Sequence, residues 1–230
     1  MMYGVKLRVW GPWACFTRPE MKVERVSYEV ITPSAARGIL EAIYWHPVIK
    51  WVITRIHVLK PIRFTNIRRN ELSHEVQVKK VKDAMEGKGD YPYICIENDR
   101  QQRASSVLKD VDYIIEAHFE YANDEEIRAK NYDPAEYKDE RLDGKHLDIF
   151  NRRAKRGQCY HRPYLGCREF PANFELVEGE LPKAIDETRD LGLILYDLDF
   201  SKDKKPILFH AKMVNGIIEV PPPGSKEVLR

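Results

Sequence analysis

The stretch TPSAARGILEAIYWHPVIKWVITRIHVLKP, residues 32–61, encodes a helix and then a strand, and this pair decides the fold of the first half of the chain. Thr32 offers a side-chain oxygen that can cap a helix, and Pro33 suits the first helical position. The apolar spacing that follows predicts a helix from residue 34 to residue 45. The β-branched run WVITRIHVL then predicts a strand over residues 51–59.

Outside this stretch, apolar alternation and the positions of Gly and Pro predict further elements. Strands are predicted at residues 2–10, 22–31, 62–68, 104–109, 112–121, 167–177, 191–198, 206–214 and 216–220, and helices at residues 74–86 and 142–155. We expect the strand at 62–68 to pair with the one at 51–59, and Lys109-Asp110 to form a turn. Asn215-Gly216 is the strongest short hairpin signal and predicts a tight turn between the last two strands.

The order strand, helix, strand, strand, helix, strand in residues 1–121 predicts a ferredoxin-like (RRM-like) βαββαβ domain. Residues 122–158 are predicted to form an acidic loop and a basic helix, and residues 159–230 a C-terminal antiparallel β-sheet extension. The predicted fold class is therefore α+β. No Gly-rich nucleotide loop follows a predicted strand, which argues against a doubly wound α/β fold.

The composition excludes several classes of protein. The chain has 230 residues, of which 43% are hydrophobic, so it can bury a core and is not a disordered protein. No apolar run reaches the roughly 18 residues of a membrane-spanning helix, and the first residues lack the pattern of a secretion signal. Four scattered cysteines without a Cys-x-x-Cys pair suit a reducing compartment, and we expect a cytoplasmic protein.

Charge is segregated along the chain, although the net charge is only +2. Residues 50–82 hold nine Lys or Arg against two Glu, and residues 142–168 hold seven against two Asp. Residues 110–141 hold eleven Asp or Glu against four Lys or Arg. This distribution favours a basic face for a polyanion such as RNA. It also fits a solvated surface on which the charges mix again in the folded chain.

Familiar catalytic motifs are absent from the sequence, which has no P-loop, no H-E-x-x-H and no G-x-S-x-G. Cys159, His161 and Cys167 are the only closely spaced soft metal ligands, and they lack the fourth ligand of a structural zinc site. We therefore expect neither a metal site nor another cofactor.

Residues 10–25, WGPWACFTRPEMKVER, interleave aromatic and basic side chains, a mixture that stacks bases and holds phosphates. The alternative is that the aromatic side chains pack in the core. The helix after Thr32 adds an N-terminus that attracts phosphate, and further arginines lie in the two basic segments. The candidate RNA-binding residues are Trp10, Trp13, Phe16, Arg18, Lys22, Arg25, Arg37, His46, Arg68, Arg69, Arg152, Arg153 and Arg156.

The motif WGPWACFTRPEMKVERVSYEVITPSAARGILEAIYWHP, residues 10–47, closely resembles the CRISPR-associated Cas-five family, in the Dvulg subtype of type I-C systems within the RAMP superfamily. Further matches are RIHVLKPIRFTNIRRNE at residues 55–71, the strand region 103–121, and RGQCYHRPYLGCREFPANF at residues 156–174. The resemblance covers nearly the whole chain.

The resemblance implies a ferredoxin-like domain with a C-terminal β extension, and an RNA ligand, the stem-loop repeat of CRISPR precursor RNA. It implies an endoribonuclease that cuts within the repeat, retains the 5′ handle and joins the other subunits of the type I-C effector complex. The catalytic group proposed for the family is a Tyr at the end of the first helix with a Lys-His pair on a later strand. The Tyr falls on Tyr44 and the His on His118, whereas the Lys falls on Ala117.

Such cleavage needs no metal ion, because RNA supplies its own nucleophile, the 2′-OH, and a His titrates near neutral pH. A cation stabilises the charge that develops on the phosphate, and Lys22, Lys60 and Arg37 are candidates to replace the missing Lys. From the residues alone, a half-buried tyrosine with one hydrogen bond is the simpler interpretation of Tyr44, and a structural or surface residue is the simpler interpretation of His118. Two functions stay open: a nuclease, and a non-catalytic subunit that binds the 5′ handle. The sequence also leaves open whether the basic face binds duplex DNA.

Overall fold

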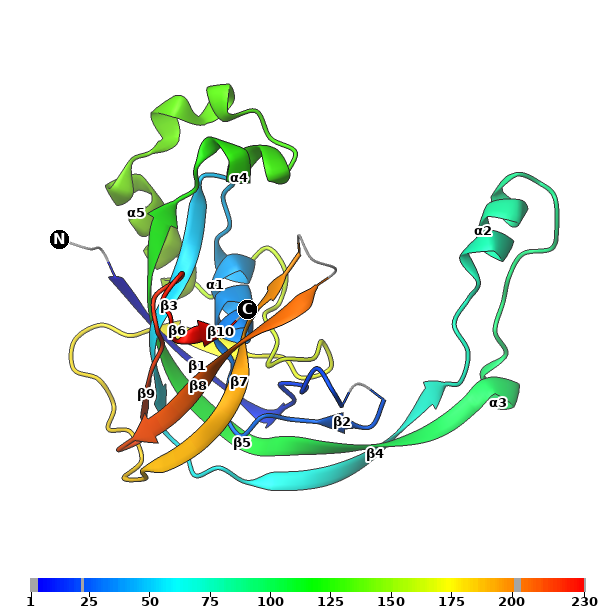
Figure 1. Ribbon diagram of the computed structural model, residues 1–230, viewed down its shortest axis with the longest axis horizontal. Helices are drawn as coiled ribbons and strands as arrows, with labels where there is room; N and C mark the ends of the chain where they lie inside the picture. Colours follow the sequence, from blue (N-terminus) through cyan, green and yellow to red (C-terminus); the bar gives the residue numbers. More distant parts are fainter. Residues whose placement is uncertain (1–3, 22, 201–203, 230) are drawn as a thin grey trace.

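One large sheet, mostly antiparallel, runs through the molecule, and helices pack against it (Figure 1). This computed structural model describes residues 4–21, 23–200 and 204–229. The strands are β1 (Gly4–Ala14), β2 (Arg25–Val26), β3 (Ile49–Val58), β4 (Phe64–Leu72), β5 (Arg100–Tyr121), β6 (Asn173–Leu176), β7 (Arg189–Asp199), β8 (Lys205–Val214), β9 (Ile217–Glu219) and β10 (Val228–Leu229). The helices are α1 (Pro33–Ile43), α2 (Val78–Met85), α3 (Ile96–Asp99), α4 (Asp124–Ala129), the 3₁₀ helix η1 (Pro134–Glu140) and α5 (Asp143–Lys155).

The strand order in the sheet is β10-β8-β9-β3-β5-β1-β6, with β2 and β4 also paired to β5, and β7 paired to β8. The pairings of the central strands β3, β5, β1 and β6 are all antiparallel, and β2 runs parallel to β5. The helix α1 contacts β3 and β7, and α5 contacts α1, β1 and β6. The chain thus has a mixed α/β fold around a large antiparallel sheet, in broad agreement with the predicted class.

The helix α1 forms where the sequence predicts it, and its ends have clear physical causes. The Thr32 hydroxyl accepts a hydrogen bond from the Ala35 N–H at 3.2 Å, which satisfies one of the free donors at the start of the helix. Ile39 and Ile43 are buried in the hydrophobic core, and α1 contacts the strand β3. The helix ends at Ile43, two residues earlier than predicted, because Tyr44 takes an extended backbone conformation.

The strand β5 is one continuous strand of 22 residues, where the sequence predicts two strands and a turn. Its first half pairs with β4 and its second half with β1 and β3. Asp110 does have the positive φ of a turn residue, 56°, but its carboxylate is fixed by Lys60 at 2.7 Å and Arg63 at 2.8 Å. The strand continues through Asp110, so residues 109–110 do not form the predicted turn. The pairing predicted for residues 62–68 is wrong, since β4 pairs with β5 and not with β3.

An arm extends away from the rest of the sheet, built from β4 and the first half of β5, with α2 and α3 at its far end (Figure 1). Neither of these helices has a buried residue. The predicted domain over residues 1–121 requires the helix at 74–86 to cover the sheet. The structure shows that this helix does not do so. The helix α5 packs against the central strands instead and buries Phe150 and Ala154.

The first strands differ from prediction at their ends. The strand β1 continues through Gly11-Pro12, where the sequence predicts a break. A Cβ on Gly11 would lie 2.7 Å from the Leu165 side chain, so this glycine permits a close approach and does not end the strand. Within the described part of the predicted strand at 22–31, the strand pairing is limited to β2 and an isolated antiparallel bridge between Ser27 and Thr17. Residues 2, 3 and 22 lie outside the described residues.

The C-terminal strands β7, β8 and β9 agree with prediction apart from small shifts at their ends, whereas β10, which pairs with β8, is not predicted. The strands β7, β8 and β9 lie where strands are predicted at 191–198, 206–214 and 216–220, and β6 is a short part of the extended segment 167–177. The turn at Asn215-Gly216 has both residues at positive φ, as the hairpin signal predicts. None of the described helices is long and apolar enough to span a membrane.

The arm generates a prediction about stability. Ser73 N–H donates to the Asp99 carbonyl at 2.9 Å, so residues 74–98 can be replaced by an Asn-Gly turn without breaking the hairpin. The melting temperature should stay within about 4 °C of the wild type, because α2 and α3 bury nothing. Ile115→Ala is the positive control and should cost about 2–5 kcal/mol, since Ile115 is fully buried in β5. A loss of stability in the shortened chain as large as that of Ile115→Ala would contradict the peripheral position of the arm.

Candidate functional site

The two faces of the central sheet carry different residues. Side chains alternate along β1 and β5, and the register pairs Gly4 with His118 and Lys6 with Glu116. These four residues share one face of the sheet, which we call the His118 face. Ala117 points the other way, into the core, and is 3% exposed.

His118 lines a pocket of about 410 Å³ on the His118 face. Its side chain is 8% exposed, and its Nε2 atom has no hydrogen-bond partner among the described residues, with the Glu120 carboxylate 3.7 Å away. The other residues that line the pocket are Gly4, Val5, Lys6, Thr54, Glu116 and Ala117. A buried imidazole nitrogen without a partner is a candidate to take up or give a proton once a ligand group reaches it.

Basic and acidic side chains are paired at the edge of this pocket, with one exception. The His57 Nε2 hydrogen-bonds the Glu116 carboxylate at 2.6 Å, and Arg55 lies 3.7 Å from the same oxygen. Arg55 also bonds Glu219 at 2.6 Å. Lys6 forms no ion pair with any residue that the structure describes. The pocket therefore holds one uncompensated cation beside His118.

Tyr44 belongs to a different cluster, at the end of α1. Its hydroxyl hydrogen-bonds His146 Nδ1 at 2.8 Å, and its carbonyl accepts from Trp51 Nε1 at 2.9 Å. The buried His146 ring lies 5.0 Å from the His46 ring, and the Arg153 guanidinium lies 5.2 Å above the Tyr44 ring. Burial raises the pKa of Tyr44, and burial together with His146 lowers the pKa of His46. Both shifts favour the neutral form of the side chain.

The structure does not bring Tyr44 and His118 together. The Phe119 ring packs on the Trp51 ring at 5.7 Å and on the His146 ring at 5.8 Å, so Phe119 lies on the same side of the sheet as Tyr44. His118 precedes Phe119 in β5 and therefore points to the opposite side. The two candidate catalytic side chains thus belong to separate clusters.

The basic segment 50–82 and the acidic segment 110–141 partly neutralise each other in the fold. Ion pairs between the two segments are Lys50–Glu126, Arg55–Glu116, Lys60–Asp110 and Arg63–Asp110. This is the mixing of charge that the sequence left open. The charge of these segments does not by itself define a face for RNA.

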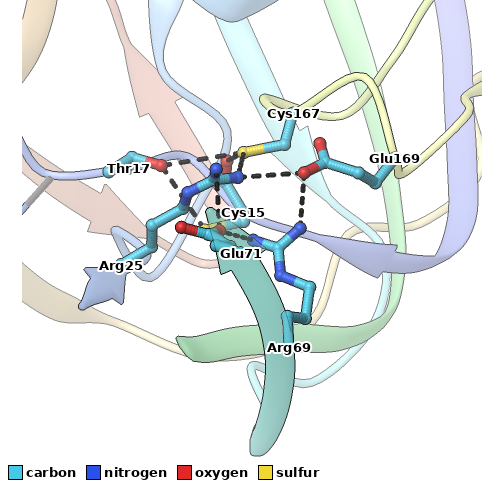
Figure 2. Close-up of polar contacts among 7 residues, drawn as sticks. All are labelled: Cys15, Thr17, Arg25, Arg69, Glu71, Cys167 and Glu169. Carbon is cyan, nitrogen blue, oxygen red and sulfur yellow. Dashed lines mark hydrogen bonds and ion pairs between the residues drawn. The ribbon is translucent and has the colours of Figure 1, made fainter. Parts of the chain in front are cut away.

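Several candidate RNA-binding residues make contacts within the chain. Phe16 is buried against Tyr113, Arg18 lies over the Tyr28 ring, Arg37 pairs with Glu41 and Asp197, and Arg25 and Arg69 pair with Glu71 and Glu169 (Figure 2). Arg153 donates to the Ile43 carbonyl at 3.0 Å. Phe16 therefore takes the core-packing alternative stated for the aromatic residues of this segment.

Other candidates remain available at the surface. Arg68, Arg152 and Arg156 are exposed and have no ion pair among the described residues. Trp10 and Trp13 are half-buried, and the Arg8 guanidinium lies 5.2 Å from the Trp10 ring. Lys22 lies outside the described residues. The exposed arginines of α5 and of the residue after it are the candidates in this set that a phosphate could reach most easily.

Sequence reasoning missed Lys6 and Tyr160. Tyr160 follows α5, is 91% exposed, and is held by a hydrogen bond from its N–H to the Ala42 carbonyl at 2.8 Å. An exposed aromatic ring close in sequence to Arg156 is a signal of base stacking that the sequence did contain. Lys6 could be found from the alternation of β1, but only once its register against β5 is known. Among the described residues, no group of three or more His, Cys, Asp or Glu side chains is arranged to hold a metal ion.

Known proteins match this chain over nearly its whole length. Residues 4–221 match a family model described as CRISPR-associated protein (Cas_Cas5). The chain is 49% identical to CRISPR pre-crRNA endoribonuclease Cas5d of Mannheimia succiniciproducens, over 100% of both chains. It is 40% identical to the protein of the same name from Thermus thermophilus, over 100% of this chain and 96% of that one. A crystal structure of a CRISPR-associated protein shares the fold, with a TM-score of 0.66 at 24% identity over 96% of this chain and 94% of the other.

Proposed function

Because this chain belongs to the CRISPR-associated Cas5d family, we propose that it is an endoribonuclease that cleaves CRISPR precursor RNA. The observation that carries the proposal is the match of the whole chain to two relatives that are named for this activity. The resemblance inferred from residues 10–47 is thereby confirmed. The proposal also gives the protein a place as a subunit of the type I-C effector complex that retains the 5′ handle of the cleaved RNA.

We further propose a ferredoxin-like central unit, made of β1, α1, β3, β5, α5 and β6. The support comes from comparing the order in the chain with the order in the sheet. In the chain, α1 lies between β1 and β3, and in the sheet β5 lies between these two strands. In the chain, α5 lies between β5 and β6, and in the sheet β1 lies between these two strands. This is the arrangement of two split βαβ units. In this assignment the second helix of the unit is α5, so the unit extends beyond residue 121 and includes part of 122–158.

His118 is the proposed proton-transfer group. In the reaction, the 2′-OH of RNA gives its proton to a general base and its oxygen bonds the adjacent phosphorus, while the bond from phosphorus to the 5′-oxygen breaks and that oxygen takes up a proton from a general acid. His118 either accepts the first proton or donates the second, and solvent supplies the other partner. The products are a 2′,3′-cyclic phosphate and a 5′-OH. The support is that His118 lines a pocket on the sheet and that its buried Nε2 has no hydrogen-bond partner among the described residues, because a free imidazole nitrogen can serve as a general acid or base.

Lys6 is the proposed cation of this centre. It lines the same pocket as His118 and has no ion pair among the described residues, whereas Arg37 and Lys60 are held by carboxylates. Ala117 cannot be replaced by a charged residue at low cost, because its side chain lies in the core and a buried charge is unfavourable. A cation for the phosphate is therefore better supplied from β1, on the His118 face.

Tyr44 with His46 and His146 is the alternative catalytic centre. Three rings that can bind or release protons lie together there, with Tyr44 hydrogen-bonded to His146. The Tyr44 hydroxyl already has a hydrogen-bond partner, whereas His118 Nε2 has none among the described residues, so we prefer His118. Paired variants separate the two centres.

The first functional prediction concerns His118. With excess protein, labelled repeat RNA and excess EDTA, the wild type should cleave, because the proposed chemistry needs no metal ion. His118→Ala should lower the single-turnover rate by about 10²–10⁴, the usual share of a general acid or base. Binding of the RNA should change little. Loss of wild-type cleavage in EDTA with recovery in Mg²⁺ would overturn this mechanism.

Tyr44→Phe is the matched variant at the alternative centre. It removes one hydroxyl and leaves His146 Nδ1 without its partner, so it should lower the stability by about 1–3 kcal/mol. The cleavage rate below the melting temperature should stay within a few-fold of the wild type. A large loss of cleavage rate in Tyr44→Phe with no loss in His118→Ala would instead identify the Tyr44 cluster as the catalytic centre. Tight binding of RNA by a wild type that never cleaves it would support the non-catalytic subunit.

A further prediction tests the charge of Lys6. Lys6→Met should lower the cleavage rate by about 10²–10³, the effect of removing one group that stabilises charge in the transition state. Lys6→Arg should restore most of that rate because it keeps the cation. Lys80→Met is the control, since Lys80 is exposed in α2 on the arm. Equal rates for Lys6→Met and Lys80→Met would remove Lys6 from the site.

Binding of RNA phosphates should depend on the exposed arginines near the end of α5. The double variant Arg152→Ala, Arg156→Ala should weaken RNA binding and reduce the slope of log Kd against log salt by about 1.4–1.8, as expected for two lost phosphate contacts. The cleavage rate at saturating protein should be unchanged. The control is Lys205→Ala with Lys212→Ala on β8, two exposed positions in the C-terminal extension. A salt slope equal in both double variants would contradict this assignment.

A further inference from the structure

Two cysteines that are far apart in the sequence meet at the end of β1. Cys15 directly follows β1, and Cys167 lies in the segment 158–171 after α5. The Cys15 N–H donates to the Leu165 carbonyl at 3.0 Å, and the Cys167 thiol donates to the Cys15 carbonyl at 3.4 Å. Gly166 approaches so closely that a Cβ there would lie 2.1 Å from the Cys15 carbonyl oxygen. The main chain thus fixes the two cysteines beside each other.

Polar groups around the pair stabilise negative charge on Cys167 (Figure 2). The Thr17 hydroxyl lies 3.5 Å from the Cys15 sulfur and 3.7 Å from the Cys167 sulfur, and Arg25 Nη1 donates to the Cys167 sulfur at 3.6 Å. The neighbouring Cys15 thiol lowers the pKa of Cys167, as do Thr17 and Arg25, against the opposing effects of burial and Glu169. The Cys167 thiol and burial raise the pKa of Cys15. Cys167 is therefore the cysteine of the pair that ionises more readily.

The cation beside the sulfur is itself held in place. Arg25 bonds Glu169 at 3.0 Å and Glu71 at 3.1 Å, and Arg69 pairs with the same two carboxylates. A thiolate next to an arginine is the environment of reactive cysteines in proteins. Cys167 is half-buried whereas Cys15 is fully buried, so a reagent in solution reaches Cys167 first.

We propose that Cys167 is a modification site for low-molecular-weight disulfides and that Cys15 is its resolving thiol. The Cys167 thiolate attacks one sulfur of the reagent, the reagent's S–S bond breaks, and the leaving thiolate takes a proton from solvent. Cys15 then gives its proton to solvent and attacks the modified Cys167 sulfur, which releases a second thiol. The protein loses two electrons as the Cys15–Cys167 disulfide forms, and the reagent gains them as two thiols.

The modification has a defined structural consequence. It links the end of β1 covalently to the segment that follows α5 and carries the exposed Tyr160. It also removes the negative charge of a Cys167 thiolate next to Arg25, so the net charge around that guanidinium becomes more positive. The charge near two candidate RNA-binding arginines, Arg25 and Arg69, then depends on the oxidation state of the pair.

The test uses the full chain in a background in which Cys95 and Cys159 are replaced by Ser, so that the pair is the sole source of thiols. Glutathione disulfide is added at pH 7, and the products are followed by intact mass and peptide mapping. The background protein should lose two hydrogens and show a Cys15–Cys167 cross-link. Cys15→Ser or Cys15→Ala should instead accumulate one stable glutathione adduct on Cys167. Cys167→Ser should react at least about tenfold more slowly.

Arg25→Gln tests the environment of the thiolate. The pH midpoint for alkylation of Cys167 by iodoacetamide should lie below the value of about 8.5 for an ordinary cysteine, and Arg25→Gln should raise it. Arg18→Gln is the matched control, because Arg18 packs on Tyr28 and does not contact either sulfur. A midpoint near 8.5 in the background protein, or an adduct on Cys167 that persists with Cys15 present, would overturn the proposal. Neither readout depends on RNA cleavage.

Discussion

The pairing of β5 with its neighbours is the interaction on which the rest of the structure depends. This single strand contributes backbone hydrogen bonds to β1, β3 and β4, which come from three different parts of the chain. In its second half, Ile114 and Ile115 are both fully buried. A shift of one residue in register would exchange the two faces. His118 would then enter the core and Ala117 would face the pocket, so the register of β5 fixes which side chains can meet a ligand.

Local signals in the sequence were sufficient for α1 and for the last hairpin. Thr32 and Pro33 specify the start of a helix, and Asn215-Gly216 specifies a turn, through interactions within a few residues. Long-range pairing was not predictable in the same way. Nothing near residues 62–68 indicates that this strand prefers β5 to β3, because the preference comes from backbone and side-chain contacts made across the sheet. The helix at 74–86 has the pattern of a helix, but only the fold reveals that it has no surface to cover.

The candidate site shows the same limit. Tyr44 and His118 became candidate catalytic residues through a resemblance to known proteins. That resemblance does not indicate on which face of the sheet each side chain lies. Lys6 becomes a candidate only when β1 is aligned with β5. Phe16 sits among basic residues in the sequence, yet the fold places it against Tyr113 in the core. Cys15 and Cys167 are brought together by a segment that crosses the end of β1, which no spacing rule for cysteines anticipates.

The ion pairs of Arg25 and Arg69 have a consequence for how this protein discriminates among polyanions. An exposed arginine that meets a phosphate releases a counterion to bulk solution, and the entropy of that release drives indiscriminate binding. Arg25 and Arg69 already hold Glu71 and Glu169 in place of mobile ions. A phosphate can reach them only by displacing a tethered carboxylate, which gains far less entropy than a free ion. The two glutamates therefore make Arg25 and Arg69 weaker general attractants for phosphate than unpaired, exposed arginines would be.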